Sequence, residues 1–245
     1  MLKKLNFLHF ESLGSTNQKL YQLIEKDVPS WTVVSADKQT SGKGYASNVW
    51  LSEDYKNATF SFLLKHPFQV HEELALLNMW ISTEISQFLS KWHINAKVKW
   101  PNDIIINNKK MAGILIETKL VGDRVKFCVI GLGININQVV FGDLEHVSSL
   151  KLESQGRNFK VQDFIKNLML HFYNNFYKME NKHFDIIYDT YNEQLFKKGK
   201  VSVFEIDNQK MNGIIQYVNR EGNLVVDLED RGVKTFRHKE IKLLY

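Results

Sequence analysis

Residues 39–50, QTSGKGYASNVW, place a lysine between two glycines and a tryptophan shortly after them. Gly42 and Gly44 tolerate unusual backbone dihedral angles and let a ligand approach the main chain closely. Consecutive exposed N–H groups can form an anion-binding nest, and Lys43 adds a mobile positive charge suited to phosphate. Trp50 could serve as an apolar lid or a stacking surface. The alternative is a surface turn with a solvated lysine and a packed tryptophan, and this stretch alone leaves both explanations open.

This loop matches neither of the standard nucleotide-binding fingerprints. It departs from GxxxxGK[ST] and from GxGxxG, and no helix start follows it, although a phosphate-binding loop normally leads into a helix. The eight histidines show no metal-ligand spacing, and no GxSxG nucleophile motif occurs. The single cysteine, Cys128, lies in an apolar run, so a buried thiol is favoured over a nucleophile.

A further lysine lies where apolar residues dominate. In KKMAGILIE, residues 109–117, Lys110 follows an Asn-Asn turn and begins a predicted strand. Period-two alternation predicts one strand face made of Lys110, Ala112, Ile114 and Ile116. A lysine on an apolar face is costly unless its ammonium reaches solvent or meets an anion, and both explanations remain open. The small side chains of Ala112 and Gly113 would leave room for a ligand.

The motif KWPND, residues 99–103, precedes this strand. Pro101 favours extended backbone in the residue before it. Asn102 and Asp103 either close a turn or contact a nucleotide or a metal.

The motif GLGININ, residues 131–137, ends the next predicted strand. Asn135 and Asn137 alternate outward from an apolar segment, and edge asparagines satisfied by neighbouring backbone explain them equally well. The residues therefore indicate a site for an anionic ligand without specifying which one.

A predicted set of short strands and amphipathic helices positions these motifs. Strands are expected at residues 5–12, 31–37 and 57–65, and a three-strand meander within 96–137. Helices are expected at residues 14–26, 71–92, 161–179 and 184–196, and a loop at 141–158. Four short strands follow at 200–207, 211–219, 223–229 and 233–241, a pattern typical of a small barrel. We therefore predict two domains, residues 1–198 and 199–245.

Composition indicates a globular protein with a substantial core, since 44% of the 245 residues are hydrophobic and 24% are charged. The net charge of +5 is compatible with nucleic acid or an acidic partner, but no dense Lys/Arg block occurs, so a solvated lysine-rich surface explains it equally well. The first residues contain only a broken apolar stretch, so we expect no signal peptide, no membrane span and a cytoplasmic location.

Taken together and in order, GSTN, QTSGKG, VKWPND, KKMAGILIE and GLGININ resemble the motifs of biotin protein ligases. The resemblance covers residues 12–137, and the β-rich C-terminal part is similar to the last domain of that family. It implies an α/β (α+β) fold, in which a mixed sheet flanked by helices, as in class II aminoacyl-tRNA synthetases, precedes an SH3-like barrel. It also implies that biotin and ATP with magnesium give biotinyl-5'-AMP, from which biotin passes to a lysine of a carboxyl carrier domain.

The resemblance also implies roles for individual residues. Biotin would be contacted by Ser15, Thr16, Asn17, Gln39, Gly42, Lys43, Gly44, Tyr45, Lys110 and Gly113. The adenylate would be contacted by Trp50, Asn102, Lys110 and Asn135. Lys110 and Lys43 would act in catalysis by stabilising the charge that develops during adenylation, and Asp103 would be the candidate magnesium ligand.

Two features depart from the family pattern. The family loop is commonly G-R-G-R-x-x-x-x-W, whereas Lys43 and Tyr45 replace the arginines here. Lys43 keeps the charge but loses the bidentate fork, and Tyr45 keeps neither. Members that also act as repressors carry an N-terminal DNA-binding domain, whereas here the first predicted strand begins almost at residue 1. We therefore expect a monofunctional ligase that does not bind DNA, with a carrier domain as its partner; a homodimer is compatible with the sequence.

Two rival functions remain open. The first is a lipoate or octanoate ligase of the same broad fold, which GSTN together with KWPND disfavours. The second is a non-catalytic relative that only binds biotin or a carrier domain, which the presence of Lys110 disfavours. ATP-dependent incorporation of biotin against lipoate, and biotin-dependent pyrophosphate exchange, would separate these functions.

Overall fold

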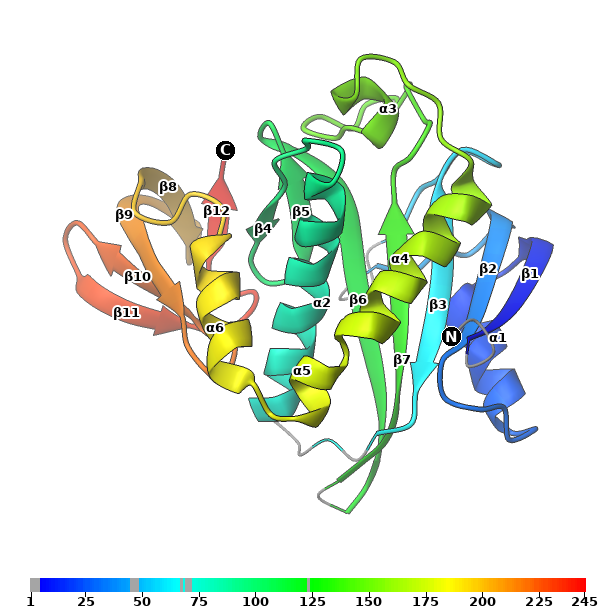
Figure 1. Ribbon diagram of the computed structural model, residues 1–245. Coiled ribbons are helices and arrows are strands. Elements are labelled where there is room, and N and C mark those ends of the chain that lie inside the picture. The colour runs from blue at the N-terminus through cyan, green and yellow to red at the C-terminus, as the bar shows by residue number, and fades with distance from the viewer. Residues whose placement is uncertain (1–4, 45–48, 67, 69–71, 123) are drawn as a thin grey trace.

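The structure is a computed structural model that describes residues 5–44, 49–66, 68, 72–122 and 124–245. Among these residues the main sheet has seven strands in the order β1-β2-β3-β7-β6-β5-β4 (Figure 1). Their bounds are Asn6–Leu13 (β1), Thr32–Gln39 (β2), Ala58–Leu64 (β3), Lys97–Lys99 (β4), Asp103–Ile106 (β5), Lys109–Val121 (β6) and Arg124–Ile134 (β7). β1 is parallel to β2, and the other neighbouring pairs are antiparallel. The predicted mixed sheet is therefore confirmed.

Helices cover both faces of this sheet (Figure 1). Their bounds are Thr16–Ile24 (α1), Glu72–Ser90 (α2), Leu150–Glu153 (α3), Val161–Asn175 (α4), Tyr177–Glu180 (α5) and Phe184–Glu193 (α6). Leu63 of β3 and Val129 of β7 pack with Leu20 of α1. Their sequence neighbours Phe62 and Cys128 belong to the main core cluster, which also contains residues of α2 and α4. Because alternate strand residues point to opposite faces, α1 lies on one side of the sheet and α2 and α4 lie on the other.

A second, antiparallel sheet of five strands follows, in the order β11-β10-β9-β8-β12. Its strands are Val201–Ile206 (β8), Gln209–Val218 (β9), Leu224–Leu228 (β10), Gly232–Phe236 (β11) and Lys242–Leu244 (β12). The sheet packs beside α6 and β4, and the Trp100 indole N–H donates to the Gly222 carbonyl oxygen at 2.8 Å (Figure 1). The proposed division at residues 198 and 199 remains a prediction.

The structure corrects three details of the predicted elements. The meander has four strands, because Lys97–Lys99 forms the short additional strand β4. Residues 141–158 contain the single turn α3, which is too short to show periodicity but is capped by the Ser149 hydroxyl, an acceptor for the Leu152 N–H. The C-terminal sheet gains β12, which pairs with the distant strand β8 rather than with its sequence neighbour.

The buried thiol of Cys128 predicts a loss of stability at alkaline pH. Burial raises the pKa of Cys128 from 9.0 to about 12. Above 9.0 the unfolded chain releases this proton while the fold retains it, so the free energy of unfolding falls as the pH rises toward about 12. In Cys128→Ala we expect that slope to be shallower by up to about 1.4 kcal/mol per pH unit. Urea unfolding of both proteins across this interval measures it, and identical slopes would contradict the assignment.

Candidate active site

A cavity of about 500 Å³ lies on the α1 side of the main sheet, and residues 238–243 of the C-terminal part contribute to its wall. The residues predicted at the site that line it are Ser15, Thr16, Asn17, Gln39, Lys43, Gly44, Trp50, Asn102, Asp103, Lys110 and Gly113. Gly42 and Asn135 lie outside this lining. Tyr45 lies outside the described residues. Motifs that are far apart in the sequence therefore meet in one cavity.

Lys110 reaches the cavity because β6 carries a bulge. In the pairing with β5, Ile104 lies opposite Ala112 but Ile105 lies opposite Lys110, so one residue of β6 is extra. The extra residue shifts Lys110 onto the face of Gly113, whose added Cβ would lie 3.5 Å from the Lys110 Nζ. The prediction that Lys110 shares a face with Ala112 is therefore wrong. Ala112 and Ile114 are buried in the main core.

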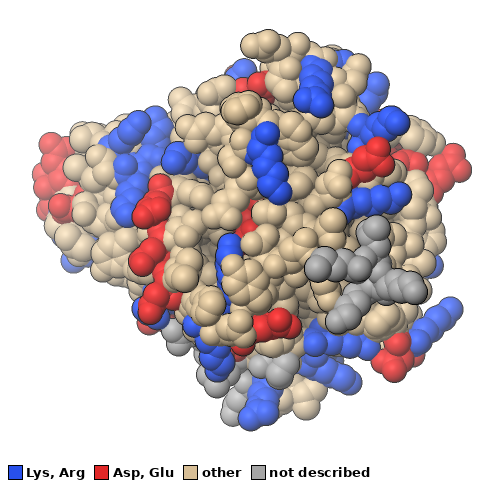
Figure 2. Space-filling model, viewed as in Figure 1, with Lys and Arg blue, Asp and Glu red and all other residues tan. Residues whose placement is uncertain are grey.

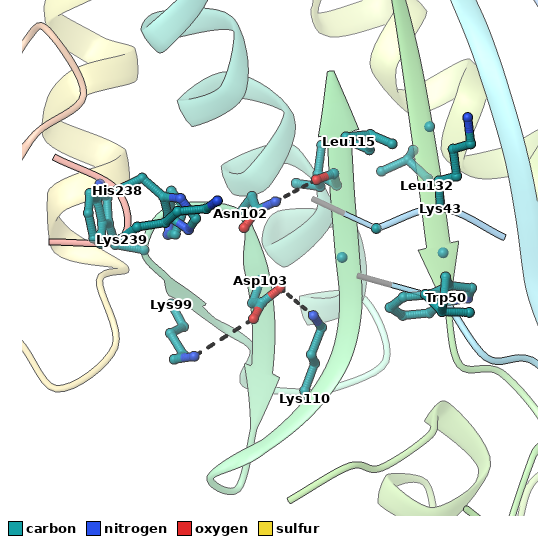
Figure 3. A pocket seen from close by; sticks show the side chains of 18 of the residues that line it. Lys43, Trp50, Lys99, Asn102, Asp103, Lys110, Leu115, Leu132, His238 and Lys239 are labelled. Atoms are coloured by element: carbon teal, nitrogen blue, oxygen red, sulfur yellow. Dashed lines mark hydrogen bonds and ion pairs between the residues drawn. The ribbon is translucent and has the colours of Figure 1, made fainter. Parts of the chain in front are cut away.

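Asp103 joins two lysines at one end of the cavity (Figure 3). Its Oδ1 lies 2.6 Å from the Lys110 Nζ, and its Oδ2 lies 3.8 Å from the Lys99 Nζ. Burial lowers the pKa of Lys99, and the carboxylate of Asp103 opposes that shift. Cations therefore surround Asp103, an arrangement that suits a polyanion more readily than a bare metal ion. The described residues contain no group of three or more side chains able to hold a metal.

The opposite end of the cavity is lined by neutral polar groups. The Thr16 backbone N–H donates to Gln39 Oε1 at 3.0 Å, and the Thr16 hydroxyl lies 2.6 Å from the buried Ser61 hydroxyl. Ser61 in turn donates to Asn17 Oδ1 at 2.5 Å. Ser15, the residue at the N-cap of α1, is buried beside them. This end can hydrogen-bond a polar, uncharged group.

Glycines form the floor between the two ends. Gly113 and Gly133 are cross-strand partners, and Gly131 lies two residues before Gly133 on β7. A Cβ on Gly133 would come within 2.6 Å of the Trp50 ring, and one on Gly131 would come within 2.5 Å of Asn17 Oδ1. Trp50 therefore lies flat against a floor that only glycine permits, and the Lys110 Nζ is 5.6 Å from the ring centroid.

The glycine–lysine loop closes on itself next to this floor. The backbone N–H of Trp50 donates to the Gly42 carbonyl oxygen at 3.1 Å, and Lys43 forms a β-bridge with Val49. A Cβ on Gly42 would meet the Trp50 carbonyl oxygen at 2.5 Å and the Gln39 amide at 2.8 Å, so glycine is required there. Lys43 approaches the cavity from the side opposite Lys99 (Figure 3).

The two predicted asparagines differ in position. Asn102 lines the cavity, and its amide donates to the Ile114 carbonyl oxygen at 2.7 Å. Asn135 is buried and donates to the Ser148 carbonyl oxygen at 3.0 Å, so its side chain holds the 146–150 segment against β6. Contact of either residue with an adenylate remains a prediction.

Residues 9–135 match the Biotin/lipoate A/B protein ligase family, which is more than half of the chain. The chain belongs to this family. The chain is 38% identical to the bifunctional ligase/repressor BirA of Bacillus subtilis over 136 residues, which are 54% of this chain and 41% of that protein. It is 32% identical to the human biotin–protein ligase over 111 residues, 42% of this chain and 15% of that protein. The matched region thus spans about two fifths or less of these curated relatives.

Solved structures in this ligase family share the fold. The biotin protein ligase of Aquifex aeolicus in complex with biotin and ATP superposes with a TM-score of 0.79 at 24% identity, covering 98% of each chain. That of Leishmania major in complex with biotinyl-5-AMP gives 0.66 at 19% identity, covering 95% of this chain and 98% of that chain. Both alignments include the main sheet and the C-terminal sheet.

Several residues of this family member's cavity escape sequence reasoning. Lys99, His238, Lys239 and Lys242 line the cavity, and Ser61 and Glu117 lie behind the lining, in hydrogen-bond contact with Asn17. Lys99 is part of KWPND, and the motif could have indicated it. His238, Lys239 and Lys242 reach the cavity only through packing of the C-terminal sheet, for which the local sequence carries no signal. Lys99, Lys239 and Lys242 make the Asp103 end more basic than predicted.

The surface of the protein and its helices add two observations. On the face shown in Figure 2, basic and acidic side chains intermingle, and no continuous basic stripe crosses the described residues. No helix among the described residues combines the length and apolar character needed to cross a membrane.

Proposed function

We propose that this protein is a biotin protein ligase that forms biotinyl-5'-AMP and then biotinylates a lysine of a carboxyl carrier domain, that of acetyl-CoA carboxylase or a related enzyme. The observation that carries the proposal is the polarity of one continuous cavity. Thr16 and Gln39 provide neutral hydrogen-bonding groups at one end, and Lys110 and Lys99 provide positive charge at the other. The glycine floor joins the two ends. This order matches biotin, in which an apolar chain connects a bicyclic urea to a terminal carboxylate.

Adenylation follows from that orientation. A carboxylate oxygen of biotin attacks the α-phosphorus of ATP, the bond to the bridging oxygen breaks, and pyrophosphate leaves. Lys110 neutralises charge on the reacting carboxylate and α-phosphate, and Lys43 approaches from the loop side. Lys99, Lys239 and Lys242 line the cavity where the departing pyrophosphate would lie. No covalent enzyme intermediate is needed, so Trp50 and the loop serve to exclude water.

Transfer uses the same carbonyl carbon. The neutral amine of the acceptor lysine attacks it, AMP leaves with the bonding electron pair, and the amine loses a proton to give the amide. Asp103 is the carboxylate nearest to Lys110 and can accept or orient a proton there. Magnesium would enter with ATP, held by phosphate oxygens and at most by Asp103, because that carboxylate is already paired with lysines.

The polar end of the cavity favours biotin over lipoate or octanoate. A hydrocarbon or dithiolane group placed against Thr16 and Gln39 would offer no hydrogen bond to these polar groups, which costs affinity. The ureido ring of biotin supplies N–H groups and a carbonyl oxygen there. A cytoplasmic location, the absence of DNA binding and a homodimer remain predictions.

The test is incubation with ATP, magnesium and a carboxyl carrier domain, with biotin, lipoate or octanoate in parallel, read as the mass shift of the carrier domain. We expect a shift with biotin alone, and none when the acceptor lysine is replaced by arginine. A mass shift with lipoate or octanoate instead of biotin would contradict biotin as the substrate. Absence of biotin-dependent pyrophosphate exchange would indicate a non-catalytic relative.

Lys99→Met is expected to raise the KM for ATP by about tenfold and to leave the KM for biotin unchanged. The reason is that the variant removes one charged donor at the end of the cavity assigned to the phosphates. Lys200→Met, at an exposed lysine outside the cavity lining, is the control for loss of charge. Steady-state pyrophosphate release measures both constants; an equal rise in the two KM values would contradict the assignment.

A further inference from the structure

A hydrogen-bond chain leads from a carboxylate on β6 to the polar end of the cavity. Glu117 accepts from the Asn17 amide at 2.5 Å, Asn17 accepts from Ser61 at 2.5 Å, and Ser61 contacts Thr16 at 2.6 Å. Glu117 follows Gly113 at period two on the face of β6 that lines the cavity. Asn17, Ser61 and Thr16 are each at most 5% exposed, so their hydrogen bonds are largely shielded from bulk water.

The two ends of this chain fix its direction. A carboxylate can only accept, so Asn17 turns its NH₂ toward Glu117 and its oxygen toward Ser61. Ser61 must then donate to Asn17, and its short contact with Thr16 is made by the Thr16 proton. At the other end a backbone N–H, that of Thr16, can only donate, so Gln39 turns its oxygen toward it.

This direction leaves two acceptors facing each other. The Thr16 Oγ1 lies 3.2 Å from the Gln39 Oε1, within reach of a hydrogen bond donated by Thr16, but the direction of this chain turns the one Thr16 hydroxyl proton toward Ser61. Both residues line the cavity. A ligand N–H placed against the pair donates to both oxygens, whereas a hydrocarbon leaves the two oxygens opposed with no donor between them.

We propose that Glu117 is a positioning residue that sets this hydrogen-bond chain so that the cavity selects a ligand with N–H donors. Glu117 acts through Asn17 and Ser61 and does not touch the ligand. The inference rests on the proposed function, because the ureido ring of biotin supplies the N–H donors. A carboxylate serves better than an amide because it can never reverse the chain by donating.

The experiment compares binding of biotin with that of 5-(thiolan-2-yl)pentanoate, which keeps the sulfur ring and the acid chain but lacks the ureido ring. Calorimetry on the full chain gives the ratio of the two dissociation constants. Glu117→Leu is expected to lower the preference for biotin by about 10- to 100-fold. Without the carboxylate the Asn17 amide is free to turn, and the Thr16 hydroxyl is then free to donate elsewhere than to Ser61. Glu117→Gln, which can still accept from Asn17, is expected to retain most of the preference.

Three controls separate positioning from folding and from the proposed function. Ser61→Ala removes the next link without touching Glu117, and the double variant with Glu117→Leu is expected to lose no more than either single variant. Glu193→Gln, at an exposed carboxylate of α6, is expected to behave as wild type. Unchanged preference in Glu117→Leu, or equal weakening of both compounds, would overturn the positioning role. Wild-type protein that binds neither compound would instead overturn the proposed function.

Discussion

Lys110→Ala is expected to slow biotin-dependent pyrophosphate exchange by about 100- to 1,000-fold, the usual effect of removing one electrostatic stabiliser of a transition state. The bulge in β6 places this ammonium beside Gly113 and 2.6 Å from Asp103, at the end of the cavity assigned to the reacting carboxylate and phosphate. Because the charge develops only as the mixed anhydride forms, kcat is expected to fall more than the affinity for biotin.

Lys109→Ala is the matched control for that experiment. Lys109 precedes Lys110 on the same strand and is exposed, so its loss changes the net charge equally without altering the cavity. Lys110→Arg tests geometry, because a guanidinium keeps the charge on a different shape, and it is expected to restore only part of the rate. Exchange in Lys110→Ala at the wild-type rate would remove Lys110 from the mechanism.

Gly133→Val is expected to lower the affinity for biotinyl-5'-AMP by about 100-fold or more while the sheet still forms. The first added carbon already meets the Trp50 ring, and two further methyl groups would raise the floor on which the ligand lies. Gly14→Val introduces the same side chain at a position where the nearest atom, Gln18 Oε1, is 3.8 Å away. Affinity measured by competition, with urea unfolding as the folding control, compares the two variants; equal affinities would contradict the glycine floor.

The parts of the site that the sequence predicts well are those carried by local motifs. The glycine–lysine motif, the KWPND motif and the Lys110 strand each have recognisable residue patterns, and the structure brings Lys43, Asp103 and Lys110 to one cavity. The β-rich runs that predict β2, β3 and β7 are confirmed as strands, and most of their residues are buried because both faces of these strands are covered. Period-two alternation fails at Lys110 because a bulge adds a residue to the strand without changing its composition.

The parts that sequence reasoning misses depend on distant packing. Lys239 and Lys242 enter the cavity from a sheet whose own pattern indicates only a small β unit. Ser61 looks like an ordinary polar residue of a strand until α1 is laid over it, and Glu117 looks like a solvated strand residue until Asn17 is seen to donate to it. The contact of Ser61 with α1 and that of Glu117 with Asn17 join residues far apart in the sequence, so no local pattern could have predicted either one.

The cavity takes its walls from residues near both extremes of the sequence, with Ser15 to Asn17 on one side and residues 238–243 on another. Ser15 to Asn17 are therefore synthesised well before residues 238–243, and the cavity wall is complete only once both are present. Under the proposed function, a chain cut before residue 238 would keep the polar end of the cavity but lose part of the wall of its basic end.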